Sequence, residues 1–160
     1  MITFVTDEVA IGDSQDSIAA TTERFDATLN VAVDLDIKDP PRDDSQRLGI
    51  RRHKVGLIDG RGNDPMTFAA AILLLHSLVR NNKRVLVHCH AGQSRSPMVV
   101  AAWIAFQGFT SLDDALKQIL ALRKVDNHRQ DLYTTANEGL SLAKKVAKYG
   151  KEYGKEYGKE

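Results

Sequence analysis

One stretch of this chain constrains its fold more than any other: two apolar runs joined by a short polar segment. Residues 83–88 (KRVLVH) form a compact run rich in β-branched side chains, which predicts a buried strand at the centre of a sheet. Residues 97–107 (PMVVAAWIAFQ) are apolar almost all round, which is typical of a helix packed against such a sheet, and Gly108 ends it. The segment between them must therefore be a tight loop at the edge of the core.

The rest of the chain alternates strand and helix patterns. Short stretches of Val, Ile, Phe and Thr between turn formers predict strands at residues 2–5, 9–11, 27–33 and 51–58. Helices are predicted at residues 66–80, 112–123 and about 130–148. This alternation predicts a single-domain, three-layer α/β fold with a mostly parallel central sheet flanked by helices, over residues 1–148. A chain of 160 residues with 42% hydrophobic residues is enough for one such core.

Two segments lie outside this alternation. Residues 34–49 carry Pro40-Pro41 and several Asp, which excludes a central strand and predicts an exposed loop. Residues 149–160 repeat Tyr-Gly-Lys-Glu three times. The period of four sets Lys and Glu at helical spacing, but each Gly costs about 1 kcal/mol in a helix. We expect a solvated, low-complexity tail that at most extends the last helix.

Charge and cysteine content exclude several classes of protein. The 22 Lys and Arg balance 21 Asp and Glu, for a formal charge of +1, so no strongly basic surface for nucleic acid or an anionic membrane is predicted. The longest apolar runs, residues 68–75 and 99–106, are far shorter than the roughly 18 to 20 residues of a membrane span. The N-terminus lacks the features of a secretory signal, so we expect a cytoplasmic protein. A single cysteine excludes an internal disulfide.

The loop at residues 88–97 (HCHAGQSRSP) carries the most specific chemical signal. A buried strand, a short loop with a glycine and a helix that starts near Arg95 or Ser96 gather backbone N–H groups that bind a tetrahedral oxyanion. Cys89 lies at the base of this predicted pocket, where the N–H groups and the helix dipole favour thiolate over thiol. If its pKa fell from about 8.5 to about 6, roughly 90% would be thiolate at pH 7. We predict that Cys89 is a nucleophile.

The neighbours of Cys89 suit phosphoryl transfer. The planar fork of Arg95 can bind two equatorial phosphate oxygens at once. Ser96 can donate its hydroxyl to the cysteine sulfur when that sulfur is the leaving group. We expect His88 to order the loop by hydrogen bonding, and Gly92 to permit a backbone turn or a close approach of phosphate. The five residues between Cys89 and Arg95 are expected to line the phosphate site: His90, Ala91, Gly92, Gln93 and Ser94.

The segment HCHAGQSRS resembles the signature loop of cysteine-dependent protein phosphatases, His-Cys-(x)5-Arg-Ser/Thr, and residues 83–105 are especially similar to dual-specificity phosphatases. IGD near residue 11, the strand ending LNVA, the turn at Asp59, and Arg123 followed by Asn127 match in order. The resemblance implies a phosphocysteine intermediate and no metal or cofactor. It also implies that Arg123 supports the signature loop, whereas the residues alone equally allow Arg123 to cover a helix surface.

Such a reaction needs a general acid, because an alkoxide or phenolate leaves poorly without a proton. Asp59 ends a predicted strand and precedes a glycine turn, where the resemblance places the acid on a mobile loop. Asp64 is the alternative, although its position before Pro65 is explained by capping a helix. We predict that Asp59 protonates the leaving group and later takes a proton from the water that hydrolyses the phosphocysteine.

The resemblance implies a phosphorylated protein or peptide as substrate. The chain begins almost at its first predicted strand, without the segment that deepens the pocket of tyrosine-specific phosphatases. We therefore expect a shallower site that accepts phosphotyrosine and phosphoserine or phosphothreonine. Phosphoinositides are an alternative, but related phosphatases that act on them often carry extra Lys in the loop, where this chain has only His90.

Three further alternatives remain open. An RNA 5′-phosphate substrate is disfavoured by the absence of a basic excess. Sulfur transfer would leave Asp59 without a role, and a non-catalytic phosphate-binding module is expected to lack Cys89, Arg95 or the acid. No metal site is predicted around Cys89, since adjacent strand side chains alternate in direction and no CxxC or HExxH pattern is present.

Overall fold

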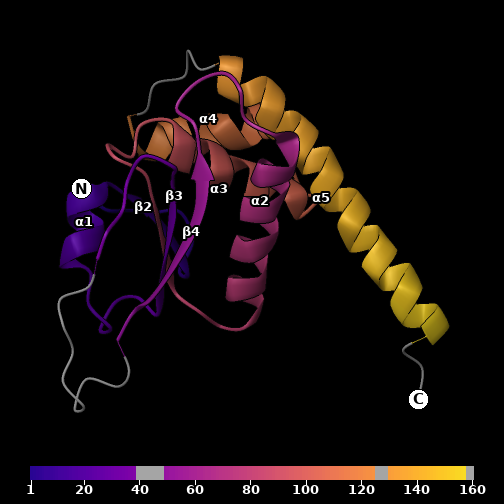
Figure 1. Cartoon of the computed structure of the whole chain (residues 1–160), viewed down its shortest axis with the longest axis horizontal. Helices are drawn as coiled ribbons and strands as arrows, with labels where there is room; N and C mark the ends of the chain where they lie inside the picture. Colours follow the sequence, from indigo (N-terminus) through magenta and orange to yellow (C-terminus); the bar gives the residue numbers. More distant parts are fainter. Residues whose placement is uncertain (39–48, 125–129, 158–160) are drawn as a thin grey trace.

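A five-stranded sheet forms the centre of the molecule (Figure 1). The computed structural model describes residues 1–38, 49–124 and 130–157. Its strand order is β1-β2-β5-β3-β4, with β1 antiparallel to β2 and every other pair parallel. The strands are β1 (Thr3–Phe4), β2 (Val9–Gly12), β3 (Ala27–Ala32), β4 (Arg51–Leu57) and β5 (Val85–His88). The predicted α/β fold with a mostly parallel sheet is confirmed.

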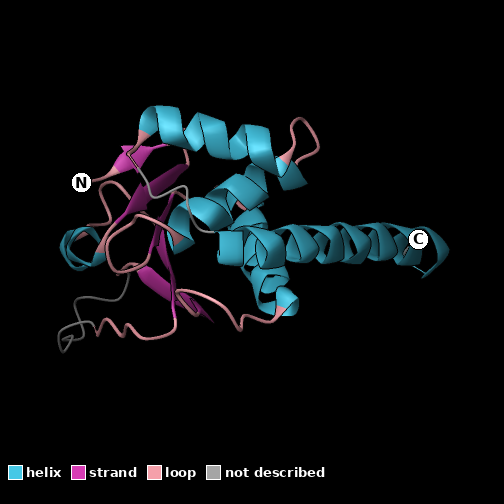
Figure 2. Ribbon diagram, turned by 90° about the horizontal axis from the view of Figure 1, so that it is seen from above, coloured by secondary structure: helices cyan, strands magenta, loops and turns pink. Residues whose placement is uncertain are grey.

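Helices lie on both sides of the sheet, which gives three layers (Figure 2). One side carries α2 (Pro65–Arg80), α3 (Arg95–Phe106), α4 (Leu112–Leu122) and α5 (Gln130–Tyr157). The other side carries the six-residue α1 (Ser14–Ala19), which the sequence analysis did not predict. In the described part of the chain, no helix is long and apolar enough to cross a bilayer.

Local sequence signals explain where these elements begin and end. Each predicted strand is present, with ends that differ by at most two residues from the prediction. Asp64 caps α2 by accepting a hydrogen bond from the Met66 N–H at 2.9 Å, and Ser111 caps α4 through the Asp114 N–H at 3.1 Å. Most of the predicted loop at residues 34–49 and Asn127 lie outside the described residues.

Strict alternation along the inner strands divides the sheet into two faces. Val9, Ile11, Leu29, Val85 and Val87 point to the helices and belong to the main core, together with Cys89. The side chains between them point to the opposite face, where Ala10, Phe25, Ile50 and Leu86 form a smaller cluster. The same alternation separates the two neighbours at the end of β5, His88 and Cys89, which face opposite sides.

The last helix is longer than the sequence alone indicated. We expected it to end near Lys148, and α5 instead continues through Tyr157, so that two of the three repeats and part of the third are helical and extend beyond the body of the molecule (Figure 2). Extending a helix that is already packed adds one hydrogen bond per residue without a new nucleation cost, which offsets the poor helix propensity of Gly. The domain boundary at residue 148 stays a prediction.

Close packing of α5 against α2 depends on one glycine. A Cβ atom added at Gly139 would lie 2.5 Å from the Phe68 Cβ and 2.7 Å from the Pro65 carbonyl oxygen. Gly150, on the same helix, has no atom within 4 Å of the corresponding position. Gly139 and Gly150 thus lie in opposite environments on α5, one crowded and one open.

We expect Gly139→Ala to lower the free energy of unfolding by about 1–3 kcal/mol, because the added methyl group overpacks the interface between α2 and α5. Gly150→Ala is the matched control, and it should leave that free energy unchanged or raise it by up to about 1 kcal/mol. Urea denaturation followed by circular dichroism measures both. Equal effects of the two substitutions would contradict the close packing.

Candidate active site

The predicted signature loop links the end of β5 to the start of α3, at the edge of the sheet where the parallel strands end. Cys89 follows His88 directly, is 3% exposed, and lies at the base of the loop. Arg95 begins α3 and is equally buried. The loop is anchored to α1, since the Ser14 N–H donates to the His90 carbonyl oxygen at 2.9 Å.

Gly92 sits at the tightest point of the loop. Its φ of +65° lies in the left-handed region, and a Cβ atom there would lie 2.6 Å from the Gly12 carbonyl oxygen. Arg123 holds the other side, because its Nε donates to the Gly92 carbonyl oxygen at 2.9 Å and its Nη1 to the Thr3 Oγ1 at 3.0 Å. The structure thus contains the contact between Arg123 and the loop that the resemblance implied.

The Cys89 thiol is surrounded by hydrogen-bond donors. Its Sγ is 3.3 Å from the Ser96 Oγ. Burial raises the pKa of the thiol, but hydrogen bonds from the Ser96 hydroxyl and from the N–H groups of Ser96 and Gly92, with the charge of Arg95, outweigh it, so that the pKa lies below its ordinary value. These are the conditions that make a cysteine a nucleophile near neutral pH.

The Arg95 guanidinium is hydrogen-bonded along only one edge. Its Nη1 donates to the Asp34 Oδ1 at 2.6 Å and to the Leu57 carbonyl oxygen at 3.0 Å. Its Nε is buried without a hydrogen-bond partner, and lies 4.0 Å from the Asp59 Oδ1. Neither Nε nor Nη2 donates to any residue in the described ranges. This second edge has the two parallel N–H groups that bind a phosphate or carboxylate in bidentate fashion.

Asp59 lies just beyond β4 and faces the same space as the second edge of Arg95. The Ser94 hydroxyl donates to its Oδ1 at 3.2 Å, and 45% of the Asp59 side chain is exposed. The turn that carries it is closed by the Asn63 amide, which accepts from the Ile58 N–H at 2.7 Å and donates to the Ile58 carbonyl oxygen at 2.8 Å. The alternative acid, Asp64, caps α2 instead.

Asp34 is a site residue that the sequence analysis missed. It follows β3, and it pairs with the Arg95 Nη1 and with the His90 Nε2, the latter at 3.1 Å. The hydrogen bond from Arg95 lowers the pKa of the Asp34 carboxyl. The signal was available in principle: Asp34 directly follows the strand predicted at residues 27–33, and the carboxyl ends of adjacent parallel strands meet at one edge of the sheet.

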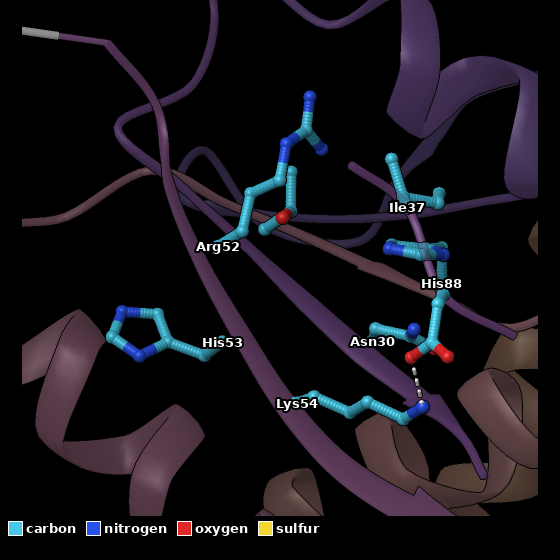
Figure 3. Close-up of a pocket in the computed structure, with 8 residues that line it drawn as sticks. Asn30, Ile37, Arg52, His53, Lys54 and His88 are labelled. Carbon is cyan, nitrogen blue, oxygen red and sulfur yellow. Dashed lines mark hydrogen bonds and ion pairs between the residues drawn. The ribbon is translucent and has the colours of Figure 1, made fainter. Parts of the chain in front are cut away.

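His88 is buried, and the alternation of side chains at the end of β5 places it on the face of the sheet opposite Cys89. Burial lowers its pKa to about 4, so the ring is neutral near pH 7. Its Nδ1 is 3.3 Å from the Cys89 carbonyl oxygen, the hydrogen bond through which we expected His88 to order the loop. His88 lines a cavity of about 130 Å³, across which Lys54 pairs with Asp36 at 2.7 Å, the dashed line in Figure 3.

Comparison with known proteins agrees with this geometry. Residues 11–138 match the family described as dual specificity phosphatase, catalytic domain. Over 124 residues the chain is 28% identical to "Putative tyrosine phosphatase 123R" of Invertebrate iridescent virus 6, which covers 77% of this chain and 80% of that protein. A thiol, an anion-binding loop and an arginine in this order along the chain define the class of cysteine-dependent phosphatases, which need no metal. The chain belongs to the dual specificity phosphatase family.

Solved structures share the fold over nearly the whole chain. Tk-PTP in its active form superposes with a TM-score of 0.70 at 20% identity, covering 90% of this chain and 96% of that one. PTPMT1 in complex with PI(5)P superposes with a TM-score of 0.72 at 15% identity, covering 91% and 98%. At these identities the similarity establishes the fold. The family match establishes that the chain is a phosphatase.

We expect Ser96→Ala to raise the pKa of Cys89, because the substitution removes a hydrogen bond that stabilises the thiolate. The rate of alkylation by iodoacetamide, measured from pH 5 to 9, should then rise at higher pH than in the native protein. Ser94→Ala is the control within the same loop, since the Ser94 hydroxyl points to Asp59. An unchanged profile for Ser96→Ala would show that its hydroxyl does not stabilise the thiolate.

Removing the Asp34 carboxylate should weaken phosphate binding, because Arg95 loses the partner that orients its free edge. We expect Asp34→Ala to raise KM for p-nitrophenyl phosphate and the inhibition constant of inorganic phosphate roughly three- to tenfold. Asp36→Ala is the matched control, since Asp36 pairs with Lys54 away from the loop. Tighter phosphate binding in Asp34→Ala would mean that Asp34 competes with phosphate for Arg95.

Proposed function

We propose that this phosphatase hydrolyses phosphotyrosine and phosphoserine or phosphothreonine in phosphorylated proteins, through a phosphocysteine intermediate. One observation carries the proposal: the Arg95 Nε has no hydrogen-bond partner in the described part of the chain and lies 4.0 Å from the Asp59 Oδ1, beside the loop that holds the Cys89 thiol. A phosphate bound by Arg95 would have the sulfur on one side and the Asp59 carboxyl near its ester oxygen. This is the arrangement that an in-line displacement needs.

In the first step the Cys89 thiolate attacks phosphorus. The backbone N–H groups of residues 90–95 and the Arg95 guanidinium bind the three non-bridging oxygens and stabilise their charge. A phosphorus–sulfur bond forms as the bond to the ester oxygen breaks, and Asp59, protonated at this stage, gives its proton to that oxygen. The dephosphorylated side chain leaves.

In the second step water hydrolyses the phosphocysteine. The Asp59 carboxylate takes a proton from the attacking water, and a phosphorus–oxygen bond forms as the phosphorus–sulfur bond breaks. The Ser96 hydroxyl, 3.3 Å from the sulfur, donates to the departing thiolate. Inorganic phosphate leaves, and both Cys89 and Asp59 return to the states in which they began.

The charges around the loop support a protein substrate over a phosphoinositide. A phosphoinositide with several phosphates would need further cations beside the signature loop. Among His90, Ala91, Gly92, Gln93 and Ser94, only His90 can carry a positive charge, and its Nε2 already faces Asp34 at 3.1 Å. A phosphorylated side chain carries a single phosphate monoester, which Arg95 and the N–H groups of the loop can bind without further cations.

The proposal is tested by hydrolysis of p-nitrophenyl phosphate and of a phosphotyrosine peptide, with EDTA present, from pH 4 to 8. Cys89→Ser should abolish turnover while the protein still binds the phosphopeptide. Asp59→Asn should lower kcat by about 100-fold or more on the peptide. The loss should be smaller on p-nitrophenyl phosphate, because p-nitrophenolate leaves more easily without a proton. Asp64→Asn is the control for the alternative acid and should keep its activity.

Each part of the proposal has an outcome that contradicts it. Turnover by Cys89→Ser would exclude Cys89 as the nucleophile, and full activity of Asp59→Asn with loss in Asp64→Asn would reverse the choice of acid. A preference of several thousandfold for phosphotyrosine over phosphothreonine would exclude dual specificity. If the native protein hydrolysed no phosphate ester, the loop would be a receptor for phosphate and the binding-module alternative would stand.

A further inference from the structure

A second concave site lies far from the signature loop, where α5 passes the C-terminal ends of α2 and α3. The cleft has a volume of about 650 Å³, within the range of sites that bind ligands. Its lining residues are Leu73, His76, Arg80, Phe106, Gln107, Phe109, Lys144, Ala147, Lys148 and Lys151. Arg95 begins α3 and Phe106, which lines the cleft, ends it, so these two residues lie about 16 Å apart along the helix axis.

The polar part of this cleft is strongly cationic. Arg80, Lys144, Lys148 and Lys151 line it, and no Asp or Glu is among the lining residues whose side chains the structure describes. Among the described side chains, none forms an ion pair with these four cations. The whole chain has a formal net charge of only +1, so this concentration of charge is local. An uncompensated group of cations in a concave site attracts an anionic partner.

The remainder of the cleft is apolar and partly open to water. Phe109 is 92% exposed on the turn after α3, next to Gly108, whose φ is +89°. Phe106, Leu73 and Ala147 provide further apolar surface. An exposed aromatic side chain next to several cations is typical of a protein interaction surface. Such a surface can bind an apolar side chain and acidic groups of a partner at the same time. The partner that fits is therefore acidic and also carries an apolar side chain.

Helical spacing explains how the cleft acquires its charge. Lys144, Lys148 and Lys151 follow one another at intervals of four and three residues, so they share one face of α5. Lys145 is exposed on the same helix and does not line the cleft. Lys151 belongs to the first Tyr-Gly-Lys-Glu repeat, so the continuation of α5 past Lys148 supplies part of the site.

We propose that this cleft docks an acidic segment, with one aromatic or aliphatic side chain, of the phosphoprotein that the enzyme dephosphorylates. The identity of the docked protein as the substrate rests on the proposed function. A span of about 16 Å corresponds to about five residues of extended chain at about 3.3 Å each. The acidic segment therefore lies about five residues or more from the phosphorylated side chain. The concave shape favours a peptide, because a side chain can enter the cleft, whereas a bilayer would meet only its rim.

Binding is tested with a fluorescein-labelled, unphosphorylated peptide of Glu residues around a single Phe, followed by fluorescence anisotropy at low salt. Lys144→Glu/Lys148→Glu should weaken binding roughly tenfold. Lys117→Glu/Lys145→Glu changes the net charge equally but lies outside the cleft, and it should change binding by less than about twofold. Phe109→Ala, which removes an exposed side chain, should also weaken binding while the charge stays the same.

A second measurement connects docking to catalysis. The native enzyme should hydrolyse a phosphotyrosine peptide with the acidic segment at a lower KM than the same peptide with Gln in place of Glu. In Lys144→Glu/Lys148→Glu this difference should disappear, while hydrolysis of p-nitrophenyl phosphate stays the same. Because the labelled peptide carries no phosphate, the anisotropy measurement tests docking independently of the proposed catalytic function.

Three outcomes would overturn the docking site. The first is that the acidic peptide does not bind the native protein. The second is that the two double variants lose binding equally, which would show a response to net charge alone. The third is that phosphatidylserine vesicles bind through the cleft lysines while the peptide does not, which would assign this surface to a membrane.

Discussion

Arg95 is a cation held almost wholly out of water, and the geometry of the site follows from how its charge is satisfied. A buried guanidinium costs several kcal/mol unless acceptors surround it. Asp34 at the end of β3 and the Leu57 carbonyl at the end of β4 meet that requirement on one edge. On the other edge the Arg95 Nε has no hydrogen-bond partner among the described residues, and the nearest carboxylate, Asp59, is 4.0 Å away, so this edge can bind a further anion. Arg95 thus links the start of α3 to the ends of two neighbouring strands, β3 and β4.

The pKa shifts of the adjacent residues His88 and Cys89 favour the neutral ring of the first and the charged thiolate of the second. Both are buried, and burial disfavours the charged form of each. His88 faces a side of the sheet where little stabilises its charge, so the ring stays neutral. Cys89 faces the donors of the loop, and Ser96 with the charge of Arg95 outweighs the effect of burial. The alternation of side chains along a β-strand thus places two adjacent residues in different electrostatic surroundings.

Local patterns predicted the parts of the structure that depend on local chemistry. The strand, loop and helix around Cys89 could be predicted because strand periodicity, a glycine turn and an apolar helix follow one another within a few residues. The helix α1 was missed because it is short and its capping box uses Asp16 in place of Glu or Gln. Asp34 was missed because its role depends on the pairing of β3 beside β5, which no local pattern contains. The continuation of α5 was underestimated because its stability comes from the packed helix before it.

The burial of a low-pKa thiol in a chain with a single cysteine also determines how this site responds to oxidants. A stabilised thiolate is the form that peroxide converts to a sulfenic acid. Many redox-sensitive thiols escape further oxidation by forming a disulfide with a neighbouring cysteine, and this chain has no second cysteine. Recovery of an oxidised Cys89 must therefore use a thiol from another molecule, such as glutathione, or a backbone nitrogen of its own loop. The reversibility of oxidative inactivation is thus set by the redox buffer around the protein and by access to a sulfur that is 3% exposed.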